Sequence, residues 1–154
     1  MRYSYKRRLT RRTGFDYSAN GRYFVTVCSQ DGALIFSEIN EEGVLILSEI
    51  GEIVKSEIER VSSIYSGVTV EKYVIMPNHI HIIIAVKTST DEITPTISRI
   101  IQQWKGSITK TLGYSIWQRS FHDHIIMNTH EYEVISDYIE NNPKKWRDDR
   151  FFLA

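Results

Sequence analysis

Hydrophobic and polar positions along the chain follow two different periods. Residues 21–30, GRYFVTVCSQ, are rich in β-branched and aromatic side chains and stop at the turn pair Asp31-Gly32, which predicts a strand. Residues 45–65 and residues 96–112 instead repeat their apolar side chains at helical spacing, with polar side chains between them. We therefore expect two amphipathic helices in these segments.

A β-hairpin is predicted in the middle of the chain. The stretches VTVEKYVIM (68–76) and HIHIIIAV (79–86) are apolar and β-rich, and only Pro77 and Asn78 separate them. This spacing predicts two antiparallel strands joined by a short turn. A further strand is expected over residues 115–127, SIWQRSFHDHIIM.

The last predicted element is a helix that begins after Asn128. Glu131 follows Asn128 at the spacing of a capping box, and Pro143 marks the expected end. The order is then β-α-β-β-α-β plus a closing helix. It predicts an α+β, ferredoxin-like antiparallel sheet with helices on one face and an added C-terminal helix. We expect one domain over residues 1–154, with a basic N-terminal arm (1–20) and a C-terminal tail (143–154).

Composition narrows the class of protein. Apolar residues make up 42% and charged residues 25% of the chain, which is ordinary for a globular protein. The single cysteine, Cys28, excludes an internal disulfide and fits a reducing compartment. No apolar run approaches the roughly 20 residues of a membrane span, and the first residues lack the apolar core of a signal peptide. We expect a cytoplasmic protein with no membrane partner.

Charge is balanced overall but unevenly distributed. Basic side chains with aromatics between them are typical of segments that follow a phosphate backbone and stack on bases, although a solvated basic tail is the alternative. The first cluster contains no acid and includes Tyr3 and Tyr5. The predicted DNA-binding residues are Arg2, Lys6, Arg7, Arg8, Arg11 and Arg12 in the first cluster and Lys144, Lys145 and Trp146 in the second.

Two histidines stand in the second strand of the predicted hairpin. His79 and His81 are two residues apart, so both side chains point to the same face of the sheet. Unpaired imidazoles are costly to bury, and two ring nitrogens on one face could bind one metal ion. Ordinary packing is the alternative.

Other chemistries of paired histidines lack their further residues. A nucleotide-hydrolase histidine triad requires a third histidine at position 83, which is Ile83, and a cupin requires a glutamate where the chain has Ile84 and Ala85. The zinc-protease pattern H-E-x-x-H is absent from the sequence. His122 and His124 form a second pair and a possible rival site.

The closing helix offers a third ligand and a nucleophile. Tyr138 and Asn142 are four residues apart and therefore share one helical face. Packed on the sheet, that face could bring an amide oxygen to a metal and a phenol beside it. A purely structural role for Tyr138 in the core is the alternative.

Three motifs together resemble the single-tyrosine HUH transposases, and in particular the REP-associated tyrosine transposases. They are MPNHIHIII, WQRSFHDHIIMN and YIENNP, which occur in that order between residues 21 and 145. The resemblance implies that Tyr138 is the nucleophile and that His79, His81 and Asn142 hold a divalent metal. Some relatives carry glutamine at the last position.

The implied chemistry is cleavage and rejoining of single-stranded DNA at sites beside a hairpin, through a 5′-phosphotyrosine. Mg²⁺ or Mn²⁺ suits this transfer better than zinc, and activity is expected to fall below about pH 6.5, where a free histidine becomes protonated. The rival hypotheses are a DNA-hairpin-binding protein that has lost catalysis and a small metal-dependent nucleotide hydrolase. A homodimer is possible if residues 21–30 form an exposed sheet edge, whereas the resemblance to the REP-associated branch implies a monomer.

Overall fold

The computed structural model describes residues 21–87 and 95–153 of the chain. The elements along these residues are β1 (Gly21–Cys28), η1 (Gln30–Gly32), β2 (Ser37–Ile39), β3 (Leu45–Leu47), α1 (Glu49–Ile64), β4 (Val68–Ile75), β5 (His79–Val86), α2 (Ile97–Leu112), β6 (His122–Ile126), α3 (Thr129–Asn141) and η2 (Pro143–Asp148).

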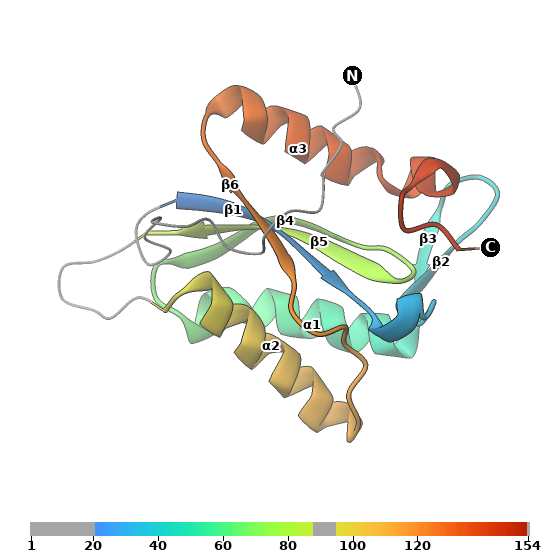
Figure 1. Cartoon of the computed structure of the whole chain (residues 1–154), viewed down its shortest axis with the longest axis horizontal. Helices are drawn as coiled ribbons and strands as arrows, with labels where there is room; N and C mark the ends of the chain where they lie inside the picture. The colour runs from blue at the N-terminus through green and yellow to red at the C-terminus, as the bar shows by residue number, and fades with distance from the viewer. Residues whose placement is uncertain (1–20, 88–94, 154) are drawn as a thin grey trace.

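Four of the strands form one antiparallel sheet in the order β4-β5-β1-β6. Figure 1 shows α1 and α2 on one face of this sheet and α3 on the other. The predicted α+β architecture is confirmed, including the predicted hairpin, which is β4-β5, and the closing helix. Among the α-helices of residues 21–87 and 95–153, α3 is the only one on its face of the sheet.

Strand alternation divides the apolar side chains between two cores. The larger core lies beneath α1 and α2, and the smaller one lies beneath α3. In β5, the side chains of Ile80, Ile82 and Ile84 enter the larger core, whereas Ile83 enters the smaller one. His79 and His81 share the face of Ile83, so they point toward α3.

The N-terminal part of the predicted helix 45–65 is a strand. Leu45–Leu47 pairs with Ser37–Ile39, and α1 starts only after Ser48, whose hydroxyl accepts a hydrogen bond from Gly51 N. A Cβ atom at Gly51 would lie 2.0 Å from the backbone oxygen of Phe36, so this close approach requires glycine. The pairing and the cap together fix where the helix begins.

The predicted strands at residues 21–30 and 115–127 are both longer than the observed ones. β1 ends at Cys28, and β6 spans only His122–Ile126, preceded by a segment in which Trp117 bridges to Ser29. The prediction that residues 21–30 form a sheet edge is wrong, because β1 pairs with β5 on one side and β6 on the other. This edge therefore supplies no argument for a homodimer.

Within residues 21–87 and 95–153, no helix combines the length and the apolar character that crossing a membrane would require.

Candidate metal and nucleophile site

The turn between β4 and β5 orients His79. Asn78 is buried, and its Nδ2 atom donates to the backbone oxygen of Phe151 at 2.7 Å and to that of Gly32 at 3.4 Å. Because the amide nitrogen is engaged there, the Oδ1 atom faces His79 Nδ1, 2.9 Å away, and must accept a hydrogen bond from the Nδ1–H group. Nε2 of His79 is then the unprotonated nitrogen, as a metal ligand requires.

His81 lies beside His79 and is held in the same way. Its Nδ1 atom is 2.8 Å from the hydroxyl of Thr26, the residue opposite it on β1. The two imidazole ring centroids are 4.6 Å apart, and both residues are 0% exposed. Neither Nε2 atom has a hydrogen-bond partner among the described residues. Two buried ring nitrogens therefore lie on this face, and His81 Nε2 also offers a lone pair when its ring proton is on Nδ1 and is donated to Thr26.

Asn142 contributes a third atom of this kind. It follows α3 directly and is buried, and its Nδ2 atom donates to Asp149 Oδ2 at 2.8 Å. Its Oδ1 atom is buried without a hydrogen-bond partner in the described part of the chain. Asp149 Oδ2 also lies 3.8 Å from His79 Nε2.

These residues fit a divalent metal. Buried polar atoms are normally paired, so three unpaired ones on neighbouring side chains indicate a missing partner. In residues 21–87 and 95–153 no three histidine, cysteine or carboxylate side chains converge on one point, so three protein ligands require the Asn142 oxygen. Two imidazoles and an amide oxygen form a mixed nitrogen and oxygen set that can hold a divalent ion, and the Asp149 carboxylate holds the Asn142 amide.

Tyr138 lies against the histidines from α3. It is half-buried, and its ring centroid is 5.3 Å from that of His81 and 6.2 Å from that of Phe24. The other tyrosine of α3, Tyr132, instead contacts Arg22, whose guanidinium carbon is 5.4 Å from the ring centroid. Tyr138 also packs against the smaller core, so its ring has a structural contact as well.

Burial keeps both imidazoles neutral. It lowers the pKa of His79 to about 3, a shift that the Asn142 side chain only partly opposes. Burial also lowers the pKa of His81 well below its usual range, and the neighbouring His79 adds to the shift. Protonation of these histidines is therefore no reason for activity to fall at pH 6.5. The expected threshold of about pH 6.5 is that of an exposed imidazole, and burial moves it lower; the fall of activity at acid pH stays a prediction.

The predicted C-terminal tail packs onto the site. The ring of Phe151 lies 4.3 Å from that of His79, and Trp146 lies 6.1 Å from His79 and 5.2 Å from Phe152. Asn78, Thr26 and Asp149 are site residues that the sequence analysis missed. Asp149 stands in the charged run KKWRDDR, where no local pattern separates it from its neighbours.

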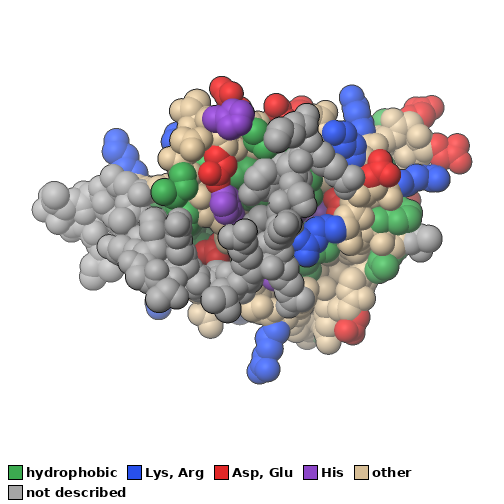
Figure 2. Space-filling view, turned by 45° about the horizontal axis from the view of Figure 1, so that its top comes forward, with side chains coloured by type: hydrophobic (Ala, Val, Ile, Leu, Met, Phe, Trp, Pro, Cys, Tyr) green, Lys and Arg blue, Asp and Glu red, His purple; other side chains and the backbone are tan. Residues whose placement is uncertain are grey.

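The predicted DNA-binding residues are only partly described. Lys144 and Lys145 are exposed and Trp146 is half-buried, whereas Arg2, Lys6, Arg7, Arg8, Arg11 and Arg12 lie outside the described residues. Figure 2 shows the described Lys and Arg side chains of one face dispersed among acidic and uncharged groups. On the part of that face that is described, basic side chains form no single patch.

One histidine of the second pair, His124, contacts the closing helix. His124 Nε2 contacts the carboxylate of Glu131, and Asn128 Oδ1 accepts from Glu131 N at 2.8 Å. The predicted cap at Asn128 is therefore confirmed, but the Glu131 carboxylate contacts β6 rather than completing a capping box. His124 links β6 to the first turn of α3.

A family profile, two solved structures and one other protein match this chain. A sequence profile of the family described as "Transposase IS200 like" matches residues 23–142. A solved structure of a REP-associated tyrosine transposase bound to a REP hairpin is 25% identical, with a TM-score of 0.65 over 93% of this chain and 74% of that one. A crystal structure from Deinococcus radiodurans R1, described as a candidate transposase, has the same fold at 15% identity (TM-score 0.51, 85% of this chain and 97% of that one). An uncharacterised protein of Haemophilus influenzae is 28% identical over 169 aligned residues, covering 96% of this chain and 93% of that protein.

Proposed function

Because the chain belongs to the IS200-like transposase family, whose members are HUH tyrosine nucleases, we propose that it is a single-stranded DNA endonuclease and strand transferase. The observation that supports this most is a cluster of three buried atoms that could ligate a metal and that have no hydrogen-bond partner in the described residues. They are His79 Nε2, His81 Nε2 and Asn142 Oδ1, and the half-buried Tyr138 lies next to them. A cluster of this kind is costly to bury without a ligand.

In this proposal His79, His81 and Asn142 hold a divalent metal, Mn²⁺ or Mg²⁺. The family is generally metal-dependent. A bound divalent ion supplies Lewis-acid polarisation of the scissile phosphate and stabilises the charge that develops there. Asn78 and Thr26 orient the two imidazoles from behind, and the Asp149 carboxylate holds the Asn142 amide.

Tyr138 is the proposed nucleophile. Its phenolic oxygen forms a bond to phosphorus as the bond from phosphorus to the 3′ oxygen breaks, which yields a 5′-phosphotyrosine and a free 3′-hydroxyl. The phenol gives up one proton and the departing 3′ oxygen gains one. Attack by the 3′-hydroxyl of another strand reverses the step and joins the ends without an external energy source.

The proposed substrate is single-stranded DNA beside a hairpin. The solved REP-associated relative is bound to a REP hairpin, and both predicted basic clusters of this chain combine cations with aromatic residues. Deleting residues 1–12 should weaken DNA binding and flatten its dependence on salt, because fewer phosphate counterions are then released. Titrations of a labelled hairpin oligonucleotide at several salt concentrations measure both effects, and an unchanged salt slope would remove the arm from the interface.

Full burial of the histidines favours a second candidate, a DNA-hairpin-binding protein that has lost catalysis. His79 and His81 are 0% exposed beneath Phe151. A covalent adduct between the protein and DNA separates the two candidates. We expect a hairpin oligonucleotide with a single-stranded flank to form an adduct in Mn²⁺ that resists denaturation in detergent, and to form none in EDTA. Binding without an adduct would favour the second candidate.

A nucleotide hydrolase would release product without any covalent adduct.

Three predictions remain predictions: the cytoplasmic location, the single domain over residues 1–154, and the choice between monomer and homodimer.

A further inference from the structure

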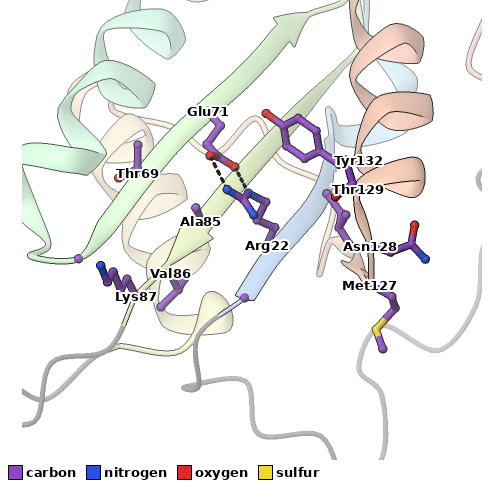
Figure 3. Close-up of a pocket in the computed structure, with 13 residues that line it drawn as sticks. Arg22, Thr69, Glu71, Ala85, Val86, Lys87, Met127, Asn128, Thr129 and Tyr132 are labelled. Carbon is purple, nitrogen blue, oxygen red and sulfur yellow. Dashed lines mark hydrogen bonds and ion pairs between the residues drawn. The ribbon is translucent and has the colours of Figure 1, made fainter.

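A cavity opens on the α3 side of the sheet, at the end of β5 opposite to His79 (Figure 3). Its volume is about 800 Å³, within the range of sites that bind small organic groups. Polar and charged side chains from β1, β4, the end of β5 and the start of α3 line much of it: Arg22, Thr69, Glu71, Lys87, Asn128 and Tyr132.

A cation, a carboxylate and an aromatic ring meet in this cavity. Arg22 Nε donates to Glu71 Oε1 at 2.7 Å, and the guanidinium carbon lies 5.4 Å from the Tyr132 ring centroid. The Arg22 side chain is 54% exposed, so its planar group remains accessible. An exposed ion pair of this kind contributes little to stability, so the fold itself gains little from the arrangement.

A β-bulge in β4 lets two consecutive side chains, Glu71 and Lys72, point toward α3. Val70 pairs with Ile84 and Lys72 with Ile83, so Glu71 is an extra residue in β4 without a partner on β5. Regular alternation would send Glu71 and Lys72 to opposite faces of the sheet. Instead, Glu71 bonds to Arg22 and Lys72 bonds to Ser136 of α3, so both point toward α3. Bulges commonly re-aim a side chain beside a functional site.

We propose that this cavity binds one unstacked nucleobase of the single strand that Tyr138 cleaves. The base would lie on the exposed guanidinium plane of Arg22, beside the Tyr132 ring, because bases stack on guanidinium planes as they do on aromatic rings. The remaining guanidinium N–H groups and the Glu71 carboxylate offer donors and acceptors to its edge, and Lys87 offers a cation to its phosphate.

The position of the cavity suits a nucleotide that lies along the strand from the cleaved bond, because Ala85 follows His81 by four residues, about 13 Å along β5. Tyr132 precedes Tyr138 by six residues on α3, about 9 Å along the helix axis. Both tyrosines pack beside the smaller core, so a strand lying along α3 would pass both. The inference rests on the proposed function, since it assigns a subsite to the same substrate.

The test combines abasic DNA with a charge-conserving variant. The probe is a hairpin oligonucleotide selected for binding from a pool with randomised single-stranded flanks, with an abasic residue placed at each flank position in turn. We expect one position at which losing the base weakens wild-type binding about 5-fold to 150-fold. Arg22→Lys keeps the positive charge but loses the planar guanidinium group. The variant should therefore bind the intact probe more weakly than wild type by the same factor, and an abasic residue at that position should cause no further loss of affinity.

Arg60→Lys is the matched control. Arg60 is similarly exposed, at 56%, and pairs with Glu57 on α1, on the opposite face of the sheet. It should reproduce the wild-type abasic profile. Tyr132→Phe, which retains the ring, should do the same.

Three outcomes separate this inference from the proposed function. Equal abasic losses in wild type and Arg22→Lys would overturn the base site, while an adduct at Tyr138 would still support cleavage. A single sensitive position without any adduct would support the base site and contradict cleavage. Absence of wild-type binding to every single-stranded probe would overturn both.

Discussion

Replacing Asn78 with alanine removes the side chain that sets the orientation of His79. In the folded protein, His79 Nδ1 donates to Asn78 Oδ1 at 2.9 Å, and Asn78 Nδ2 donates to the backbone oxygen of Phe151 at 2.7 Å. Without Asn78 the imidazole can rotate and can carry its proton on Nε2. A protonated Nε2 cannot bind a metal.

The size of the effect follows from the contacts that are lost. Removing the partner of a metal-bound histidine typically costs 10- to 100-fold in metal affinity, about 1.4 to 2.7 kcal/mol. Asn78 is only 4% exposed, so each hydrogen-bonding group that the variant leaves buried and unpaired costs a further 1 to 3 kcal/mol or so in stability. Asn78→Asp keeps an acceptor for His79 but no donor for Phe151. It should retain metal binding and lose only stability.

A calorimetric titration with Mn²⁺ measures the affinity for the metal. The ¹⁵N NMR spectrum of the metal-free protein reports which nitrogen of His79 is protonated. Asn40→Ala is the control, because Asn40 Oδ1 accepts from Glu42 N at 3.0 Å and Val44 N at 2.9 Å in the turn between β2 and β3. It should lose stability but keep its Mn²⁺ affinity. If Asn78→Ala bound Mn²⁺ as tightly as wild type, with Nδ1 still protonated, the proposed role of Asn78 would be refuted.

Three further predictions concern stability and the placement of α3. Gly51→Ala should lower the free energy of unfolding by about 1 to 3 kcal/mol, because its Cβ would lie 2.0 Å from a backbone oxygen. Gly106→Ala should raise that free energy by about 0.5 to 1 kcal/mol, because its Cβ would have nothing within 4 Å. Urea denaturation that gave both changes the same sign would contradict this. In metal-free protein the free energy of unfolding should fall as pH decreases from about 6.5 toward 3, with a contribution of about 1.4 kcal/mol per pH unit from His79, since the unfolded chain takes up a proton that His79, with a pKa of about 3, does not. An unchanged slope in His79→Gln would contradict that origin. Lys72→Met should slow cleavage without changing the affinity for Mn²⁺, because Lys72 of β4 contacts Ser136 and Glu140 of the helix that carries Tyr138. A parallel loss of Mn²⁺ binding, measured by calorimetry, would count against a positioning role for Lys72.

Local patterns were sufficient for most of the fold. Alternating or continuous apolar runs located the main strands, and the apolar repeat located the helices, because each element buries a whole face. The β2-β3 hairpin was missed because three-residue strands are too short to show a period. Leu45–Leu47 extended the apolar pattern of α1, although Ser48 could have been recognised as its N-cap. The central place of β1 depends on long-range pairing, which one segment of sequence does not reveal.

The candidate site was predictable only where spacing within one element decides the geometry. His79 and His81 share a face because the strand period is two, and Tyr138 and Asn142 share a face because the helical repeat is near four. Contacts between distant segments could not be read in this way. Asn78 and Phe151 are 73 residues apart in sequence, yet their contact helps to orient His79. The low pKa of the histidines also follows from burial, which only the packed structure defines.

The residue that bonds to DNA tests the proposed function most directly. The adduct formed in Mn²⁺ can be digested with a glutamyl endopeptidase, which cuts after Glu133 and Glu140 and releases residues 134–140, a fragment whose one tyrosine is Tyr138. Tyr132 leaves on a different fragment. The proposed function predicts a nucleotide mass on the 134–140 fragment, an adduct with Tyr132→Phe and none with Tyr138→Phe. A nucleotide mass on the fragment that carries Tyr132, or an adduct with Tyr138→Phe, would contradict it.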